Sequence, residues 1–277
     1  MSNLVQITKD QSGKEIVMVR VDKTLKELMV EKPASRWDAD YWHPKWEKLM
    51  DQINASPIKF SALGDIFPTE EWLISTDHVR ASRGEKEADN YPVEYYTPAN
   101  LLFTGYDVSK IPHCTENAFT RMSRARPSQL DLLLGGFGMG PTGKSIVLWQ
   151  KPSVKAIVGN IFILRTKDKY SPFVLDVFFK SVFGQGQLNR VKMGVAMNKL
   201  SNDQITSTLV PLFTPSQVQF IESEYKKMTV FHDKAMESKE KDDEASCKDN
   251  LEIAVKMLKD LISKTEGVIR GKQEDVS

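Results

Sequence analysis

The spacing of apolar residues changes along the chain and divides it into three parts. Residues 1–35 contain a polar start, the β-branched run EIVMVRV at 15–21 and a short amphipathic segment at 22–32. Residues 36–213 are a mixed region of short apolar runs, and residues 214–277 have a helical pattern. We therefore expect an N-terminal extension, one mixed domain and a C-terminal helical region.

Short apolar runs separated by turn residues dominate the mixed region and predict strands. The runs are KFSALGDIF, VEYYTPANLLFTGY, LDLLLGGFG, SIVLW and VKAIVGNIFILR. Two helical patterns flank them: one starts near Pro44 and continues to Ile53, and one covers 171–191, with Gly184 as its expected end. The predicted fold class is α+β, a sheet-rich domain that is mostly antiparallel, with long loops and flanking helices.

The C-terminal region begins with a compact helix-start signal. Thr214 can cap the helix, Pro215 can occupy its first turn and Gln217 can complete a capping box. Two apolar seams with coiled-coil spacing follow, separated by a polar stretch at 237–250. The seam residues are Ile221, Tyr225, Met228, His232 and Ala235, then Leu251, Ala254, Leu258, Leu261, Thr265 and Val268. Because the two seams are out of phase, the region is either one long coiled-coil-type helix with a discontinuity or a helical hairpin.

Composition narrows the class of protein. The 277 residues are 40% hydrophobic and 27% charged, which is typical of a folded, soluble protein. Cys114 and Cys247 lie far apart, and no two of the four histidines form an H-x-x-x-H pair, so we expect neither a disulfide framework nor a metal site. The N-terminus lacks a signal-peptide core and no apolar run is long enough to span a bilayer. A cytoplasmic protein without membrane contact is therefore expected.

The segment GMGPTGKS at 138–145 fits the phosphate-binding pattern G-x-x-x-x-G-K-[ST] at every fixed position. In a P-loop, the helix that follows supplies N–H groups and a positive dipole end to the phosphates. Here the following residues, SIVLWQKP, are typical of a strand and a turn. We therefore favour a glycine-rich hairpin that presents Thr142, Lys144 and Ser145 to a ligand, with a P-loop nucleotide-binding protein as the alternative.

Several fragments occur in an order found in one protein family. They start with RWDADYWHPKW at 36–46, continue through IKFSALGDIF and VEYYTPANL to the segment at 130–165, and end with GQGQLNRVKMGVAMNKLSNDQITSTLVPL at 184–212 and TPSQVQFI. This order resembles the specificity subunits of type I restriction–modification systems over residues 36–236. A full subunit of that family has two target-recognition domains and two helical regions. The chain has room for one of each, so it resembles a half-subunit.

The resemblance implies sequence-specific recognition of double-stranded DNA. Residues 36–213 would be the DNA target-recognition domain, and residues 214–277 the dimerisation or partner-docking region. The chain itself would be non-catalytic and would hold no cofactor. An adenine methyltransferase subunit would methylate DNA with S-adenosylmethionine, and a restriction or motor subunit would cut it. The recognition domain of a fused DNA methyltransferase is a further alternative.

Candidate DNA contacts are polar residues of basic loops, of the glycine-rich hairpin and of the segment at 184–192. Arginine suits guanine edges, glutamine suits adenine, and lysine suits phosphate. The candidates are Arg80, Arg83, Arg121, Arg124, Thr142, Lys144, Gln185, Gln187, Arg190 and Lys192. We expect no catalytic residue and no metal ligand among them.

The expected assembly is a two-fold homodimer. The two C-terminal seams carry more apolar surface than a lone helix exposes to water, so each other, a second copy or the methyltransferase must cover them. A closed two-fold pair is the commonest solution for one self-complementary surface. Its DNA target would be an inverted repeat with a fixed gap.

Overall fold

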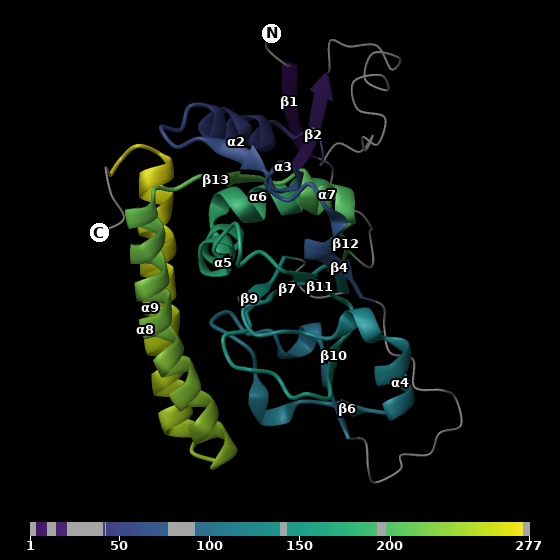
Figure 1. Ribbon diagram of the computed structural model, residues 1–277. Coiled ribbons are helices and arrows are strands. Elements are labelled where there is room, and N and C mark those ends of the chain that lie inside the picture. The colour runs from purple at the N-terminus through teal and green to yellow at the C-terminus, as the bar shows by residue number, and fades with distance from the viewer. Residues whose placement is uncertain are drawn as a thin grey trace. The chain divides into compact units, whose positions relative to one another are not determined.

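The computed structural model describes residues 4–9, 15–20, 41, 43–76, 92–138, 143–192 and 198–273 (Figure 1). The chain divides into two compact units, residues 1–56 and 57–277. The predicted short helix at 22–32 lies outside the described residues, as does most of the opening motif at 36–46.

The first unit contains an antiparallel hairpin and a helix. Strands β1 (Leu4–Lys9) and β2 (Glu15–Arg20) pair over their whole length, so the β-branched run forms a strand as predicted. Helix α2 (Pro44–Asn54) has Pro44 in its first turn, also as predicted. Its N-cap is His43, whose Nδ1 accepts a hydrogen bond from the Lys45 amide at 3.1 Å.

Small sheets form the centre of the second unit. A four-stranded antiparallel sheet has the order β4–β11–β7–β9, and a three-stranded sheet has the order β10–β5–β6. Two further antiparallel pairs are β12–β8 and β13–β3. The strands are β3 (Phe60–Ala62), β4 (Leu73–Ser75), β5 (Val93–Tyr96), β6 (His113–Cys114), β7 (Leu132–Gly135), β8 (Phe137–Gly138), β9 (Ser145–Val147), β10 (Ala156–Val158), β11 (Ile161–Leu164), β12 (Asn198–Lys199) and β13 (Leu209–Pro211). The α+β class and the mostly antiparallel sheet are confirmed, and only the β10–β5 pair is parallel among the described strands.

The central strands β7 and β11 are buried on both faces, because their apolar runs LLLG and IFIL have no polar alternation. A glycine is required where they meet: a Cβ at Gly136 would lie 2.0 Å from the Phe162 ring. The run KFSALGDIF is only partly a strand, because α3 (Leu63–Ile66) follows β3 directly.

Two helices, α5 (Pro172–Lys180) and α6 (Val182–Val191), follow the sheet where the sequence predicts one. Ser181 separates them and caps α6, since its hydroxyl accepts a hydrogen bond from the Gly184 amide at 3.2 Å. The prediction that Gly184 ends a helix is wrong. It lies inside α6, and a Cβ there would be 2.2 Å from the Phe178 carbonyl oxygen, so this glycine permits a close backbone approach. The remaining short helices are α4 (Glu116–Arg121) and α7 (Asn202–Thr206).

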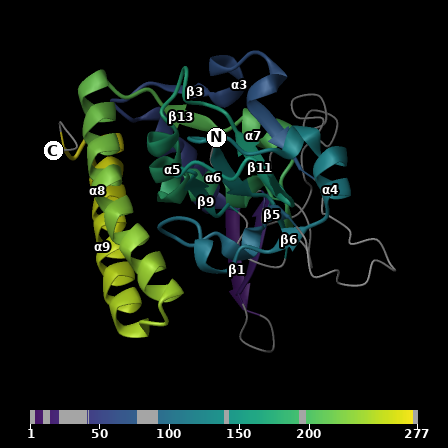
Figure 2. The same cartoon turned by 60° about the horizontal axis from the view of Figure 1, so that its bottom comes forward.

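The C-terminal region is a helical hairpin of α8 (Pro215–Glu240) and α9 (Glu244–Ile269), which run side by side in Figures 1 and 2. The predicted capping box is present, since the Thr214 amide donates to Gln217 Oε1 at 3.0 Å and the Gln217 amide donates back to Thr214 Oγ1. Asp242 has a positive φ of 58° in the turn between the helices. The seams are out of phase because they belong to two helices.

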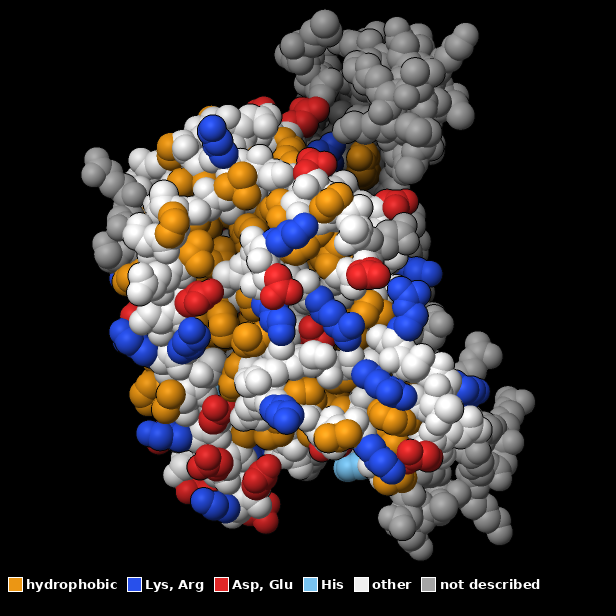
Figure 3. All heavy atoms as spheres, in the orientation of Figure 1, with side chains coloured by type: hydrophobic (Ala, Val, Ile, Leu, Met, Phe, Trp, Pro, Cys, Tyr) orange, Lys and Arg blue, Asp and Glu red, His pale blue; other side chains and the backbone are white. Residues whose placement is uncertain are grey.

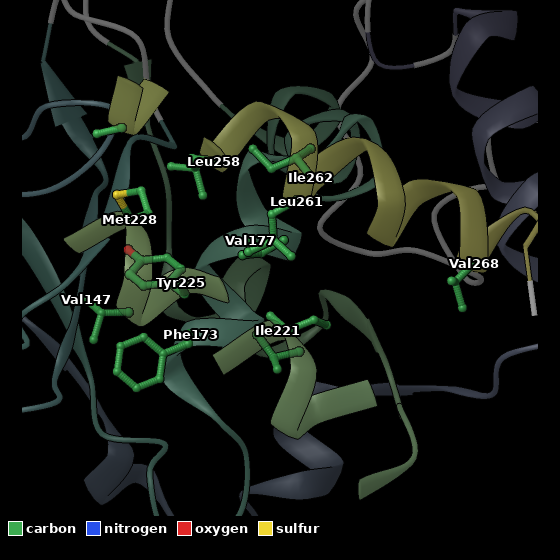
Figure 4. Packing of buried hydrophobic residues seen from close by; sticks show 12 residues of the cluster. Val147, Phe173, Val177, Ile221, Tyr225, Met228, Leu258, Leu261, Ile262 and Val268 are labelled. Atoms are coloured by element: carbon green, nitrogen blue, oxygen red, sulfur yellow. The ribbon is translucent and has the colours of Figure 1, made fainter. Parts of the chain in front are cut away.

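The chain buries both seams within itself. All eleven seam residues are buried except Leu251, which is partly buried. Figure 4 shows Tyr225 of α8 grouped with Phe173 of α5 and Val147 of β9, and Leu258 of α9 belongs to the same cluster. Of the three ways to cover the seams considered above, the structure shows the one within the chain, so the seams need no second copy.

Polar contacts also fix α8 against the sheet-bearing part of the unit. His232 Nε2 faces the Tyr106 carbonyl oxygen at 3.0 Å, and Nδ1 faces Thr104 Oγ1 at 2.9 Å. A carbonyl only accepts, so Nε2 carries the proton and Nδ1 accepts from the threonine. Next to it, Asp233 accepts from Trp149 Nε1 at 3.1 Å. The neutral imidazole is therefore fully paired in the folded state.

This pairing makes the stability of the second unit depend on pH. Burial lowers the pKa of His232 below its ordinary value of 6.5. The unfolded chain then binds a proton that the folded chain does not, so stability is full above about pH 6.5 and decreases below it. We expect the wild-type protein to lose about 1 kcal/mol more than His232→Gln between about pH 7.5 and pH 5.5 in denaturant titrations.

The matched control is His113→Gln, which removes an exposed histidine and should keep the wild-type pH dependence. Equal pH dependence in the wild type and in His232→Gln would contradict this account.

Candidate nucleic-acid interface

The glycine-rich segment ends in a strand and not in a helix, as predicted. Lys144 is followed directly by β9, in which Ser145 pairs with Leu134 of β7. The backbone groups after Lys144 therefore take part in a sheet and are not gathered at a helix N-terminus, where phosphates bind. Gly138 belongs to β8, and Thr142 lies outside the described residues.

The side chains at the end of this hairpin point to different environments. Lys144 is exposed, and its Nζ lies 3.4 Å from the Leu101 carbonyl oxygen. The neighbouring Ser145 is buried, and its hydroxyl donates to Asp176 at 2.6 Å. In a P-loop this hydroxyl would hold a metal ion beside the phosphates. The lysine is thus available to an anionic ligand, whereas the serine is part of the interior.

Two of the candidate residues in α6 already have backbone partners. Gln185 Nε2 donates to the carbonyl oxygens of Gly143 at 2.9 Å and Phe179 at 2.7 Å. Gln187 is buried, with its Nε2 donating to the Leu209 carbonyl at 2.9 Å and its Oε1 accepting from the Leu209 amide at 2.9 Å. Gln187 therefore joins α6 to β13 and does not present its amide to solvent.

The other candidates occupy the end of α6 and the α4 region. Arg190 and Lys192 are half-buried, and Lys192 donates to Asn189 Oδ1 at 3.1 Å. Arg121 and Arg124 are exposed on α4 and the turn that follows it. Arg80 and Arg83 lie outside the described residues.

Two surface hollows adjoin these candidates. Lys144 and Gln185 line one of about 270 Å³, together with Lys180 and the partly exposed ring of Phe103. Arg124 lines another of about 760 Å³, with Arg165 and Lys169. The structure thus brings Lys144 and Gln185 together. It places the two candidate arginines Arg121 and Arg124 on a separate segment.

Charge is unevenly distributed over the second unit. Residues 143–192 contain nine Lys or Arg against two Asp or Glu, whereas residues 215–273 of the helical hairpin contain eleven against twelve. Of the two acidic residues in the first segment, Asp176 is buried, so only Asp168 adds negative charge to its surface. In Figure 3, Lys and Arg side chains gather over the centre and right of the described surface. This segment can therefore attract a polyanion although the whole chain is almost neutral.

Sequence reasoning missed Asp176, Lys180 and Phe103. Asp176 and Lys180 are spaced i, i+4 in α5, whose other residues are apolar, and that spacing is the signal of a buried ion pair. Phe103 lies in an irregular segment and has no comparable signal.

The described residues contain no group of three His, Cys, Asp or Glu that could hold a metal ion. Cys114 and Cys247 are both free and buried. No helix in the described part of the chain is long and apolar enough to cross a membrane.

No family model matches the chain, and no curated protein matches it. Solved structures of type I restriction–modification proteins are similar to it. The type I restriction–modification system S subunit from M. genitalium has 10% identity and a TM-score of 0.40, over 65% of this chain and 40% of that one. A structure of the type I R-M system, described by its complex assembly and conformational transition, has 11% identity and a TM-score of 0.43, over 90% and 55%. The HsdS subunit from Thermoanaerobacter tengcongensis has 11% identity and a TM-score of 0.41, over 90% and 54%.

The chain thus matches between 40% and 55% of the length of these three structures. All three structures are described as type I restriction–modification proteins, and two of them as the S or HsdS subunit.

Proposed function

We propose that the chain recognises double-stranded DNA as a non-catalytic specificity subunit of a type I restriction–modification complex. The observation that carries this proposal is the position of Lys144. It is an exposed cation at the end of a glycine-rich hairpin, within a segment of nine basic and two acidic residues. Lysine neutralises phosphates and so positions a protein on the duplex.

The exposed arginines supply a second part of the interface. Arg121 and Arg124 carry guanidinium groups that can form paired hydrogen bonds to guanine. We keep Arg80, Arg83, Thr142, Arg190 and Lys192 as candidate contacts. Because Gln185 and Gln187 have backbone partners, we assign them to holding α6 in place.

The partners follow from the family resemblance. An adenine methyltransferase subunit would bind S-adenosylmethionine and perform the methylation, and a restriction or motor subunit would complete the complex. The chain would supply DNA sequence recognition, and we assign no catalytic residue or cofactor to it. A P-loop nucleotide-binding protein is disfavoured because β9 follows the motif directly and Ser145 is engaged with Asp176.

We propose that a homodimer forms through the outward face of α9, since the seams are buried within the chain. Along α9, charged residues at equal distances before and after Ala254 have opposite signs. In an antiparallel two-fold pair centred at its level, each charged residue meets an opposite charge of the second copy. The facing pairs are Glu244 with Lys264, Lys248 with Asp260, Asp249 with Lys259, and Glu252 with Lys256.

The same face also carries exposed apolar surface. Ile253 is 43% exposed and would lie at the level of Val255 of the second copy. Within one chain, the only ion pair along this charged row of described residues is Lys248–Glu252, at 3.9 Å with both side chains largely exposed. Such an exposed pair contributes little to the stability of α9 itself, so these charges are available to a second copy.

The DNA-binding proposal predicts a strong salt dependence of duplex affinity. Lys144→Ala should weaken binding to all duplexes alike and make the slope of log affinity against log salt shallower by about one unit, because one phosphate contact is lost. Fluorescence anisotropy with a labelled random-sequence duplex, over a salt series, measures this.

The matched control is Lys241→Ala, which removes an exposed lysine from the turn of the helical hairpin and should leave the slope unchanged. A wild-type protein whose duplex binding does not depend on salt would rule the proposal out.

The hairpin should bind no nucleotide, because it offers no helix N-terminus to a phosphate chain. Isothermal titration with ATP or GTP and magnesium, up to about 1 mM ligand, should give no binding signal. Nucleotide binding that disappears in Lys144→Ala would instead support the P-loop alternative.

The proposed dimer predicts a charge-swap pattern. By symmetry, Glu252→Lys creates two like-charge contacts with Lys256, so it should shift the dimer toward monomer by about tenfold in dissociation constant at low salt. The double variant Glu252→Lys with Lys256→Glu should restore the wild-type value. Analytical ultracentrifugation measures both.

Glu222→Lys on α8 is the control, because it makes the same charge change beside Lys226 on the other helix. A wild type that stays monomeric at about 100 μM in low salt would disprove the α9 interface.

A further inference from the structure

Ser145, at the C-terminal end of the glycine-rich hairpin, is bound by the buried carboxylate of Asp176. Asp176 lies in the middle of α5 with no exposed surface. Its Oδ1 accepts from the Ser145 hydroxyl at 2.6 Å, and its Oδ2 accepts from the Tyr225 hydroxyl at 2.7 Å and from the Lys180 ammonium group. Three elements, β9, α5 and α8, therefore meet at one side chain.

The hairpin is held at its backbone as well. Lys180 Nζ donates to the Ser145 carbonyl oxygen at 2.5 Å, and Gln185 Nε2 donates to the Gly143 carbonyl at 2.9 Å. The contacts on Gly143 and Ser145 thus lie on either side of Lys144. A Cβ at Gly143, which has a φ of +92°, would also come within 3.2 Å of Gln185 Nε2. The direction of the exposed lysine is fixed by its two neighbours.

Burying the charges of Asp176 and Lys180 costs desolvation free energy. Burial lowers the pKa of Lys180, and the Asp176 carboxylate acts in the opposite direction. Well-packed apolar residues often stabilise a fold as well as, or better than, a buried ion pair. What they cannot do is hold a hydroxyl and a carbonyl of one residue in a single orientation. The network therefore adds to the backbone hydrogen bonds between Gly135 and Gly143–Lys144, and it fixes the hydroxyl and the carbonyl of Ser145.

Resting on the DNA-binding function proposed above, we propose that Asp176, Lys180 and Tyr225 are positioning residues for the DNA-reading hairpin. They touch no DNA themselves. They fix the Gly143–Ser145 end of the hairpin, and so the approach of Lys144 to the duplex, and they connect that end to α8.

The positioning network should affect the choice between DNA sequences more than the overall affinity for DNA. A loosened hairpin keeps the Lys144 charge, so its attraction to phosphates persists. Base contacts depend on register, because their hydrogen bonds tolerate only small displacements. Loss of the network should therefore lower the preference for the cognate duplex while leaving binding to other duplexes almost unchanged.

The test uses variants that each delete one hydroxyl and leave the buried ion pair intact. Ser145→Ala and Tyr225→Phe remove the two donors to Asp176. The matched control is Tyr170→Phe, which deletes the hydroxyl of a partly buried tyrosine that donates to the Pro211 carbonyl at 2.7 Å outside the network. All three variants should have similar melting temperatures. This comparison removes general destabilisation from the interpretation.

The first readout needs no DNA. Hydrogen exchange of a peptide covering residues 138–148, followed by mass spectrometry, should be about fivefold faster in Ser145→Ala and Tyr225→Phe than in the wild type and Tyr170→Phe, as expected for one lost hydrogen bond. Unchanged exchange in both network variants would overturn the proposal whether or not the protein binds DNA.

The second readout is discrimination between duplexes. A cognate duplex is selected by the wild type from a randomised pool and compared with a scrambled duplex of the same composition. The ratio of the two affinities should fall about tenfold in both network variants and stay constant in Tyr170→Phe. Faster exchange with an unchanged ratio would overturn the positioning role and leave the DNA-binding function intact. A wild type that selects no duplex would refute both.

Discussion

The second unit depends on the contact between Asp176 and its three donors, because this is where the sheet, helix α5 and the helical hairpin share one polar centre. A buried carboxylate without partners would be strongly unfavourable, and Ser145, Lys180 and Tyr225 are the three donors that satisfy this one. The surrounding cluster is apolar and non-directional: Val147, Phe173 and Leu258 would tolerate sliding, whereas the hydrogen bonds would not. Packing thus provides cohesion, and the carboxylate provides orientation.

The two long helices show that a correct local pattern does not identify the partner that covers it. Their seams were read correctly, with ten of eleven residues buried, but the partner that buries them is the same chain. The decisive feature is the short turn at 241–243, where Asp242 takes a left-handed conformation and Asp243 caps α9. A sequence of polar residues permits such a turn without requiring it, so periodicity alone left both topologies open. Because the seams are internal, the dimer proposed above uses the outward charged face of α9.

The features that the sequence predicted correctly depend on interactions between residues close together in the chain. The Thr214 capping box, the start of α2 at Pro44 and the strand after Lys144 are each determined by a few neighbouring residues. What the sequence did not reveal involves contacts that reach beyond one turn of helix. Gly184 looked like a helix end, although its lack of a side chain serves an approach to Phe178 across the turn at Ser181. Likewise the amide of Gln187 is occupied by Leu209, a partner 22 residues away that no local pattern identifies.

The same distinction applies to the proposed DNA interface. Which residues are basic is evident from the sequence, but their usefulness depends on what the fold leaves exposed. Near neutrality of the whole chain conceals a basic segment at 143–192 and a slightly acidic helical hairpin at 215–273. Because screening limits charge interactions to about 8 Å in physiological salt, a duplex near the basic segment would respond to local charge and not to the net value. Asp176, one of only two acidic residues in the basic segment, is buried against Lys180, so it opposes little of the positive surface while it holds the hairpin that carries Lys144.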